Sequence, residues 1–546
     1  MFRKLILWRV NGTDRHRTKR KTLRCESLEA RRALTTLFVS PIGNDDGLGS
    51  SGDPWKTLQH AADNVSAGDT VVVAAGQYAG FDLSTSGTEN NRIVFAAQPG
   101  ALINQPNQRT PDGINLEGAS YVTIQGFDVT MVPRAGIRSV INQGVIVRDN
   151  RTFDNGRWGI FTGFSEDILI EENETSGSRD EHGIYVSNSA DRPVIRQNRV
   201  WGNNASGIQI NADASQGGDG IVTDAVIERN IIYDNGQAGG SAINLDGVQD
   251  SVVHNNLLFD NHASGISLFR IDGAAGSKRN EVAFNTVIQP NDGRWAMNIQ
   301  GNSTHNRLLN NIFLNAHPFR GSIDISDDSR LGFQSDYNVL MHRFTVNQGN
   351  SVINLANWQE QTGQDQHSII ASVDELFVDW TSDDFRLSVD SPARNAGTGQ
   401  HDVEEDLNGN MRPREAAFDI GAYEFVPQLI GDFDSNQVVD AADIDRLYLE
   451  IRQGSSDVDF DLDESGTVDQ NDADYLIETV LGTTFGDSNL DGVFDSKDII
   501  DVFSAGEYQD DLSLNSSWVT GDWNGDGEFD SNDIIAALQT GAYSNG

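Results

Sequence analysis

The chain has 546 residues, with 81 acidic side chains against 39 basic ones and a formal net charge of -42. Such an excess of acid argues against a nucleic acid as the partner, because phosphate binding needs basic stripes. No stretch approaches the roughly 20 apolar residues of a membrane-spanning helix, so no membrane span is expected. The chain still has enough apolar residues to bury a core.

The first 34 residues form a separate region by charge. They hold eleven basic and three acidic residues and only one four-residue apolar run, which predicts a targeting or processing leader outside the fold. Residues 23–34 resemble the L-E-x-R-x-L export signature of large extracellular proteins of planctomycete bacteria, with Ala30 where the signature usually has Pro. The resemblance implies an extracellular or cell-surface protein. Removal of the leader would also remove Cys25, the only cysteine. The alternative is a basic tail on a cytosolic protein.

Short strands of the form Gly-Ile-x-apolar repeat through the middle of the chain, at spacings of 23 to 35 residues. Their first apolar residues are Ile114, Ile137, Ile160, Ile184, Ile208, Ile243, Ile266, Met297 and Ile323. A second series runs in step and contains Asn150, Asn173, Asn198, Asn230, Asn256, Asn285 and Asn311. This period predicts a mainly β chain folded as a parallel β-helix, because propeller blades need about 40 residues. We expect the asparagines to adopt left-handed backbone conformations at one corner and to form a hydrogen-bonded ladder.

Two segments at the ends of the repeats resemble those of known β-helix proteins. Residues 37–80, with Gly68-Asp69-Thr70-Val71 and then Gly76 and Tyr78, resemble the opening of the pectate-lyase-like superfamily. The resemblance implies a right-handed, single-stranded parallel β-helix that begins with a strand and a capping helix. Residues 376–425 resemble the closing segment of exported bacterial β-helix proteins, which implies a C-terminal cap.

Alternate residues of a strand face opposite sides, so inward-facing isoleucines place their neighbours on the outer face. The expected outer row is polar and rich in amides: Asn115, Glu117, Arg138, Tyr185, Gln209, Asn211, Asn244, Asp246, Ser267, Asn298 and Gln300. Such a row offers hydrogen bonds to the hydroxyl groups of a sugar chain. The proposed substrate-binding residues are Tyr185, Gln209, Asn211, Asn244 and Asn298. The alternative is that these positions are polar only because they face water.

The longest excursions between strands, residues 211–221 and 270–280, are predicted to wall one cleft. The second excursion contains Lys278, which is the only lysine between Lys56 and Lys497. A dense titratable cluster, residues 179–182, precedes the strand at Ile184.

Several polysaccharide lyase families share the pectate-lyase-like fold, and the resemblance implies their mechanism. A calcium ion or an arginine neutralises the carboxylate of a uronate, a Lys or Arg base removes the proton at C5, and β-elimination breaks the glycosidic bond. A lysine base must be unprotonated, so the pKa of Lys278 would have to fall, which Arg270 and Arg279 could bring about. The alternative is a solvated Lys-Arg pair. The candidate catalytic residues are Lys278, Arg270, His182 and Asp246.

The acidic C-terminal region repeats a calcium-loop pattern four times, with oxygen-bearing residues at positions 1, 3, 5, 9 and 12. The predicted metal ligands are Asp432, Asp434, Asn436, Asp440 and Asp443; Asp461, Asp463, Ser465, Asp469 and Asp472; Asp487, Asn489, Asp491, Asp495 and Asp498; and Asp522, Asn524, Asp526, Asp530 and Asp533. Position 6 requires a tight turn and is Gly466, Gly492 or Gly527 in three loops but Gln437 in the first. An apolar helix pattern follows each loop. The region resembles dockerins, which implies bound Ca²⁺ and a cohesin-like protein partner.

These patterns predict a right-handed parallel β-helix followed by a small α-helical, dockerin-like calcium module. The predicted divisions are a leader at 1–34, first coils at 35–110, repeats at 111–345, a cap at 346–426, and loop pairs at 427–482 and 483–546. The expected function is an exported lyase that cleaves an acidic, uronate-containing polysaccharide. The alternatives are a non-catalytic glycan-binding or adhesive surface protein and a glycoside hydrolase that uses Asp246, Glu181 or Asp180.

Overall fold

The computed structural model describes residues 35–399, 403–427, 429–434 and 436–544. The expected leader, with Cys25, lies outside these residues. The chain forms two compact units: the first extends to residue 424 except for 386–390, and the second contains the remainder. No helix in the part that the structure describes is long and apolar enough to cross a membrane.

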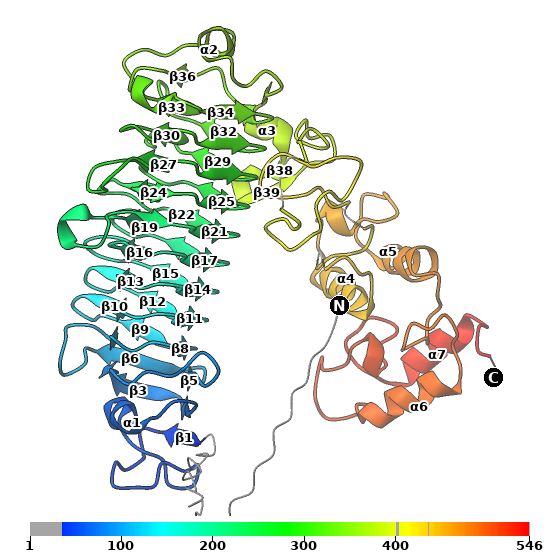
Figure 1. Cartoon of the computed structure of the whole chain (residues 1–546). Helices are drawn as coiled ribbons and strands as arrows, with labels where there is room; N and C mark the ends of the chain where they lie inside the picture. Colours follow the sequence, from blue (N-terminus) through cyan, green and yellow to red (C-terminus); the bar gives the residue numbers. More distant parts are fainter. Residues whose placement is uncertain (1–34, 400–402, 428, 435, 545–546) are drawn as a thin grey trace, which may run out of the picture. The chain divides into compact units, whose positions relative to one another are not determined.

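The first unit is a parallel β-helix in which each turn of the chain adds one strand to each of three sheets (Figure 1). Sheet 1 has 12 strands: β1 (Thr36–Val39), β2 (Thr70–Val73), β5 (Ile93–Ala97), β8 (Val122–Gln125), β11 (Ile146–Arg148), β14 (Leu169–Glu171), β17 (Val194–Arg196), β21 (Val226–Glu228), β25 (Val252–His254), β28 (Glu281–Ala283), β31 (Arg307–Leu309) and β34 (Gln334–Asp336). Sheet 2 has 11 strands: β4 (Phe81–Asp82), β7 (Ile114–Glu117), β10 (Ala135–Val140), β13 (Trp158–Gly163), β16 (Ile184–Ser187), β19 (Ile208–Asn211), β23 (Ser241–Asp246), β27 (Ser264–Phe269), β30 (Met297–Ile299), β33 (Ile323–Ile325) and β36 (Phe344–Thr345). Sheet 3 has 12 strands: β3 (Gly76–Ala79), β6 (Ala101–Gln105), β9 (Asp128–Thr130), β12 (Arg151–Phe153), β15 (Glu174–Ser176), β18 (Arg199–Trp201), β22 (Ile231–Tyr233), β26 (Leu257–Phe259), β29 (Thr286–Gln289), β32 (Ile312–Asn315), β35 (Val339–Leu340) and β37 (Ile369–Ile370).

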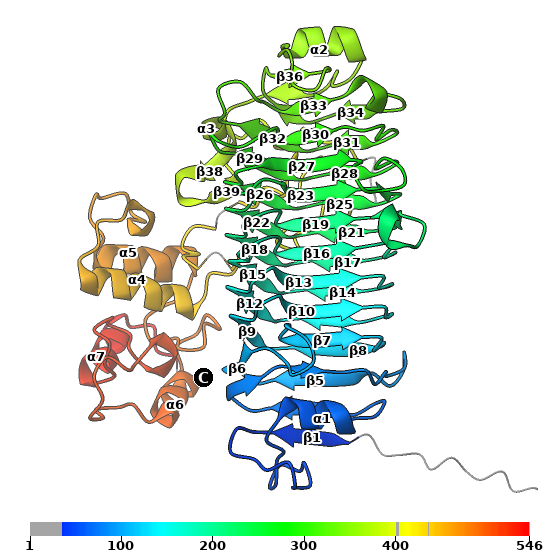
Figure 2. The same cartoon turned by 90° about the vertical axis from the view of Figure 1, so that its left-hand side faces the viewer.

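The repeating isoleucines stack in register on sheet 2, whose strands lie one above another in Figure 2. Ile137 pairs with Ile114 on one side and with Ile160 on the other. Together with inward side chains of the other sheets, they form one continuous hydrophobic column that no single coil could bury alone. The predicted fold class is confirmed.

A ladder of buried asparagines runs along the corner between sheets 1 and 3. It contains Asn150, Asn173, Asn198, Asn230, Asn256, Asn285, Asn311 and Asn338. In a typical step, Asn173 donates from Nδ2 to Oδ1 of Asn198 at 3.0 Å and to the carbonyl of Val147 at 2.8 Å. The ladder was expected.

The expected left-handed backbone of these asparagines is wrong, because it belongs to the residue that precedes each of them. Asp149 has a φ of 53° and Gln197 a φ of 55°. The preceding residue makes the corner, and the amide of the asparagine is buried inside it. There the amide satisfies backbone groups that would otherwise be buried without partners.

The two ends of the column are closed by helices. At the first end, α1 (Leu58–Asn64) packs its buried face against the first coil. At the other end, α2 (Leu355–Thr362) covers the last coil (Figure 1). Its Trp358 is fully buried and stacks on Phe344, with ring centroids 5.0 Å apart.

The region predicted as the cap, 346–426, contains α2 and continues with the segment of residues 376–425. The segment includes β38 (Phe377–Asp379) and β39 (Asp384–Leu387), which follow the short helix α3 (Val373–Leu376). It then lies along the side of the β-helix, where Gly421 donates its N–H to the carbonyl of Asn310 at 2.8 Å. Arg412 is buried there against Glu424, with a 2.7 Å ion pair. Because Trp358 already covers the last coil, this segment has no exposed apolar end to cap.

In its described residues the second unit contains four α-helices, each of which follows one of the four acidic loops. They are α4 (Ala441–Gln453), α5 (Gln470–Asp474), α6 (Ser496–Ala505) and α7 (Ser531–Gln539). A π-helical turn (Tyr475–Val480) continues α5. Side chains from both expected loop pairs meet in one hydrophobic core that includes Ile444, Leu447, Leu476, Val502 and Trp523.

Candidate functional site

The outer face of sheet 2 carries one side chain per coil in a straight, paired row. In order along the axis the row is Asp82, Asn115, Arg138, Phe161, Tyr185, Gln209, Asn244, Ser267, Asn298, Asp324 and Thr345. Four of the five residues predicted to bind substrate, Tyr185, Gln209, Asn244 and Asn298, stand in this row. Asn211 stands two residues further along the strand that holds Gln209. We call this face the groove face.

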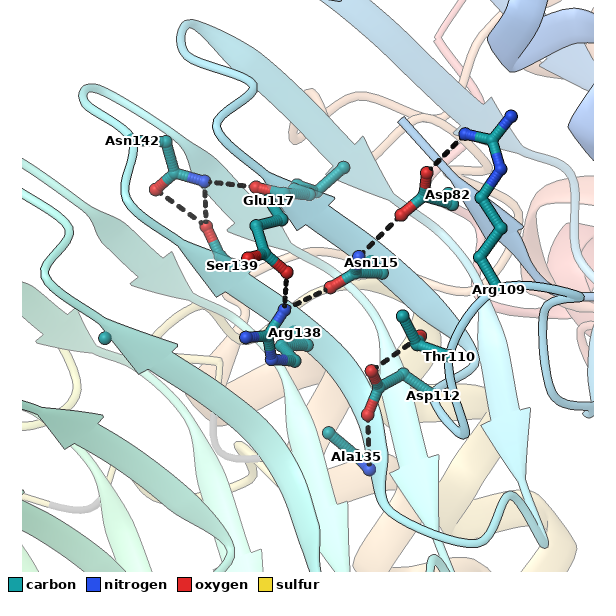
Figure 3. Close-up of polar contacts among 12 residues, drawn as sticks. Asp82, Arg109, Thr110, Asp112, Asn115, Glu117, Ala135, Arg138, Ser139 and Asn142 are labelled. Carbon is teal, nitrogen blue, oxygen red and sulfur yellow. Dashed lines mark hydrogen bonds and ion pairs between the residues drawn. The ribbon is translucent and has the colours of Figure 1, made fainter. Parts of the chain in front are cut away.

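The first end of the groove face is closed by charges that neutralise one another (Figure 3). Arg109 pairs with Asp82 at 2.7 Å, and Asn115 donates to the other oxygen of Asp82 at 2.6 Å. Arg138 then donates to Asn115 at 2.7 Å and pairs with Glu117 at 2.8 Å. Every charged group in this network has an opposite partner.

An aromatic cluster, Trp158, Phe161, His182 and Tyr185, occupies the next two coils. Trp158 stacks on Phe161 with ring centroids 4.4 Å apart, and Tyr185 meets Phe161 edge to face at 5.3 Å. Stacked aromatic rings on a solvent-facing strand are a common platform for the apolar faces of sugar rings. The expected outer row did not include Phe161. This residue follows the inward-facing Ile160, so the alternation of side chains along a strand places it on the outer face.

Glu181 fixes this cluster from behind. Its carboxylate accepts from Nε1 of Trp158 at 2.7 Å and pairs with Arg157 at 2.6 Å. His182 accepts the backbone N–H of Ser206 at Nδ1, 3.1 Å away. Burial, opposed by Glu181 and assisted by Arg157, lowers the pKa of His182 to about 4. The imidazole is therefore neutral near pH 7 and serves as a hydrogen-bond acceptor.

Amides link the middle of the groove face. Asn244 donates to Oε1 of Gln209 at 2.6 Å, and Ser206 donates to the same oxygen at 3.1 Å. Asn211 donates to Asp272 at 3.1 Å, and its own Oδ1 is buried without a hydrogen-bond partner. The row is thus ordered by its own hydrogen bonds before any ligand binds.

The two long loops, which we predicted to wall one cleft, contact each other. Ala214, in the first loop, donates its N–H to the carbonyl of Asp272 in the second at 3.0 Å. Ala274 donates back to the carbonyl of Gly220 at 2.9 Å. The loops therefore form one wall beside the groove face rather than two facing walls.

Asp246 is the anchor of this wall. Its carboxylate accepts the backbone N–H groups of Ile271, Asp272 and Gly273 at 2.8 to 3.2 Å. Burial raises the pKa of Asp246, and these three N–H groups oppose the rise. With both oxygens occupied in this way, Asp246 positions the loop that carries Arg270 and Lys278.

The four candidate catalytic residues are spread over several coils. Arg270 is exposed at the end of β27, and Lys278 is half-buried at the next corner, where it bridges to Gln249 of β24 (Val248–Gln249). β24 pairs with β20 (Val222–Thr223) in a two-stranded sheet beside sheet 2. His182 precedes β16, three coils from β27, which at about 4.8 Å per coil is roughly 14 Å away. The neighbouring Arg279 is held by Asp250 at 2.6 Å, so Asp250 offsets its charge.

A cavity of about 400 Å³ opens at the far end of the groove face. Its lining includes Arg294, Trp295, Asn298, His317 and Arg320. Our candidates included only Asn298 of these. Next to it in the row, Asp324 is 5% exposed, and its Oδ1 is buried without a hydrogen-bond partner. Burial raises the pKa of Asp324 to about 6, although hydrogen bonds from the side chain of Gln300 and the N–H of Gly349 oppose the rise.

The acidic loops of the second unit share one hydrogen-bond pattern. The N–H at position 6 donates to the aspartate at position 1, from Gln437 to Asp432 at 2.9 Å and from Gly466 to Asp461 at 2.8 Å. The third and fourth loops repeat this bond. The aspartate at position 9 caps the following helix in each loop.

Two of these loops bring three carboxylates together. Oxygens of Asp432, Asp434 and Asp443 lie within 4.8 Å of one another, as do those of Asp461, Asp463 and Asp472. Three converging carboxylates suit a hard cation, so these triads can hold a metal ion. In the fourth loop, burial and the carboxylate of Asp533 raise the pKa of Asp522 to about 7.

The β-helix is similar in fold to known right-handed β-helix structures. Residues 37–286 match the family model of the Pel9A-like right-handed β-helix region. The crystal structure of pectate lyase Pel9A is 17% identical and has a TM-score of 0.50, covering 72% of this chain and 97% of that chain. The crystal structure of alginate lyase from Paenibacillus sp. str. FPU-7 is 21% identical with a TM-score of 0.38, covering 48% of this chain and 93% of that chain.

A sequence relative is found in Bacillus subtilis (strain 168). The uncharacterized protein YwoF is 26% identical over 167 residues, which is 30% of this chain. The match spans 28% of the length of that protein. Residues 37–286 are therefore similar to the Pel9A-like right-handed β-helix region, and the first unit has the fold of a parallel β-helix.

Proposed function

We propose that the protein is exported and acts as a lyase on an acidic, uronate-containing polysaccharide that binds along the groove face. The observation that supports this most is the unbroken row from the aromatic cluster to the cationic cavity. From Phe161 to Asp324 the row spans six steps, or about 29 Å at about 4.8 Å per coil. It offers rings at one end, amides in the middle and arginines at the other end. The likeness of the fold to that of a pectate lyase agrees with this proposal.

In this proposal Lys278 is the base and Arg270 faces the carboxylate of the substrate. Lys278 takes the proton at C5, the electron pair forms the C4–C5 double bond, and the C4–O bond breaks with its electrons on the leaving oxygen. That oxygen then takes a proton from water. Asp246 and His182 are positioning residues, because Asp246 fixes the loop of Lys278 and His182 holds the backbone at Ser206.

The test is an assay of the full chain on pectate, alginate and sulfated uronate polysaccharides. Ultraviolet absorbance of the new double bond and new reducing ends are followed together. We expect both signals from the unaltered protein and neither from Lys278→Ala. Lys56→Ala is the matched control, because Lys56 is exposed and lies in the opening segment. Full activity of Lys278→Ala would overturn the role of this lysine.

Non-catalytic glycan binding is the second candidate, and a specific observation favours it. Asp246 and Arg279 are both engaged within the protein, which leaves few free acid or base groups beside the groove face. Polysaccharide binding without either signal would support this candidate. Reducing ends without absorbance would support the glycoside hydrolase.

For the second unit we propose Ca²⁺ in the four acidic loops, as a dockerin-like module that binds a cohesin-like protein. The carboxylate triads and the positive φ at position 6 support this: 88° at Gly466, 87° at Gly492 and 93° at Gly527. Calcium would here supply structural stability. Calorimetric titration of the full chain with Ca²⁺ should show binding and a rise in thermal stability. No heat and no change in stability would contradict the proposal.

A further inference from the structure

We propose that the cavity at the far end of the groove face binds the anionic group, carboxylate or sulfate, of an acidic sugar. This inference deepens the proposed function. That the ligand is a sugar rests on the proposed function, whereas its negative charge is inferred from the arginines of the cavity. The cavity is lined by Arg294, Trp295, Asn298, His317, Phe319 and Arg320, among other residues.

The two arginines occupy the same corner on neighbouring coils. Arg294 lies three residues before Met297 and Arg320 three residues before Ile323, and Met297 pairs with Ile323 on sheet 2. At the same offset on earlier coils each arginine has a carboxylate partner: Arg134 pairs with Asp112 and Arg157 with Glu181, both at 2.6 Å. At Arg294 and Arg320 two guanidinium groups adjoin instead.

Among the described residues, neither Arg294 nor Arg320 forms an ion pair, although the chain has 81 acidic side chains against 39 basic ones. Most arginines of the β-helix pair with a carboxylate, as Arg109 and Arg138 do at the opposite end. Burial and the nearby charge of Arg294 lower the pKa of Arg320. An anion between the two guanidinium groups would relieve this repulsion, and guanidinium matches the geometry of carboxylates and sulfates.

Hydrogen bonds fix the backbone and the guanidinium group of Arg320 at the cavity. Nδ1 of His317 accepts the backbone N–H groups of Phe319 and Arg320, each at 3.0 Å, which shapes the loop. Arg320 donates one N–H to the carbonyl of Gly293 at 3.1 Å, and this bond directs the guanidinium toward the loop that carries Arg294. The loop is thus set before a ligand arrives.

The remaining lining suits a sugar ring that carries the anion. Phe319, which is 45% exposed, supplies aromatic surface for its apolar face, and the buried Trp295 lines the cavity. Asn298 belongs to the groove row, so a chain lying along that row would bring a sugar to the cavity. A Cβ atom at Gly349 would lie in van der Waals contact with Nε1 of Trp295 at 3.7 Å and with Oδ2 of Asp324 at 3.8 Å, so glycine leaves this part of the cavity lining without a side chain.

The test measures binding to the full chain by calorimetry, independently of cleavage. The probes are trigalacturonate, its neutral methyl ester, and a sulfated neutral trisaccharide. We expect the unaltered protein to bind a charged probe at least tenfold more tightly than the ester. Tighter binding of trigalacturonate than of the sulfated trisaccharide would identify the anionic group as a carboxylate, and the reverse order would identify it as a sulfate.

Arg294→Gln and Arg320→Gln should each remove most of this preference, and Arg320→Lys should retain part of it. Arg179→Gln is the matched control, because Arg179 is exposed and without an ion pair among the described residues but lies outside the cavity. Circular dichroism of each variant checks the fold. Equal binding of ester and charged probes, or unchanged binding by both Gln variants, would overturn the inference.

Activity measurements on the same variants separate this inference from the proposed function. Lyase activity with unchanged binding by the Gln variants would reject the cavity and keep the lyase. Charge-dependent binding that the Gln variants lose, without any lyase signal from the unaltered protein, would keep the cavity and reject the lyase.

Discussion

The hydroxyl of Tyr448, on α4, donates a hydrogen bond to the backbone carbonyl of Trp523, 2.9 Å away in the fourth acidic loop. Both residues are buried, and Arg452 of the same helix donates to the carbonyl of Gly525 at 2.7 Å. The helix that follows the first loop is therefore fastened to the backbone of the fourth. The two expected loop pairs share contacts as well as a core.

Replacing Tyr448 by Phe should destabilise the second unit by about 1 to 2 kcal/mol, because the carbonyl of Trp523 would be buried without a donor. Thermal unfolding in saturating Ca²⁺ measures this loss. Tyr475→Phe is the matched control, since the hydroxyl of Tyr475 has no hydrogen-bond partner among the described residues. Equal stability of the two variants would show that the bond contributes nothing.

Position 6 of the acidic loops gives a reciprocal pair of variants. Gln437 has a φ of 72°, which strains a residue with a side chain, whereas Gly466 has a φ of 88° and free space around it. Gln437→Gly should strengthen Ca²⁺ binding by the first loop by about 1 kcal/mol, roughly fivefold in Kd. Gly466→Gln should weaken the second loop by a similar factor. Calorimetric titration decides, and the prediction fails if both variants shift in the same direction.

The asparagine ladder should contribute strongly to the stability of the β-helix. Asn198 accepts from the N–H and the Nδ2 of Asn173, and it donates to the carbonyl of Ile170. Asn198→Ala would leave these buried groups without partners at about 1 to 3 kcal/mol each, so we expect a loss of at least about 3 kcal/mol. Chemical unfolding of the variant measures it. Asn291→Ala, at an exposed turn, should change stability little, and a similar loss in both variants would contradict the ladder's role.

Asp324 should make the β-helix less stable as the pH rises from 4 to 7. Its folded-state pKa, about 6, lies above the ordinary 3.8, so the folded protein holds this proton more tightly than the unfolded chain. The stabilisation is complete below about pH 3.8 and is lost as the pH rises through 6. Asp324→Asn cannot ionise and escapes this loss.

Relative to Asp324→Asn, the wild-type protein should therefore lose up to about 3 kcal/mol of unfolding free energy between pH 4 and pH 7. Chemical unfolding of both proteins at the two pH values measures the difference. A gap that does not change with pH would mean that the carboxyl group titrates normally.

The repeating positions could be predicted because each coil imposes the same constraint on them. Ile137 and its equivalents must face inward, which fixes the register of sheet 2 and the outer row beside it. The asparagine ladder follows in the same way, since each Asn must meet the next. The positive φ of the residue before each Asn could not be predicted, because residues as different as Asp149 and Phe284 adopt it. The hydrogen bonds of the buried amide that follows, and not the residue type, favour this conformation.

The cationic cavity could not be found from residue type alone. Arg294 and Arg320 are 26 residues apart and belong to loops without a motif. Their equal offset from Met297 and Ile323 was the available signal, and it requires the strand register before it has meaning. Conversely, the rarity of Lys278 says nothing about its surroundings, and the pairing of Arg279 with Asp250 depends on the neighbouring coil.

The excursions on the β-helix vary in length while the rungs keep their pairing: 35 residues separate Ile208 from Ile243, and 23 separate Ile243 from Ile266. A longer or shorter loop thus leaves the hydrophobic column and the asparagine ladder untouched. Substitutions, insertions and deletions in the loops beside the groove face can therefore accumulate with little effect on folding. The same property makes loop 211–221 a suitable place to graft new recognition sequences.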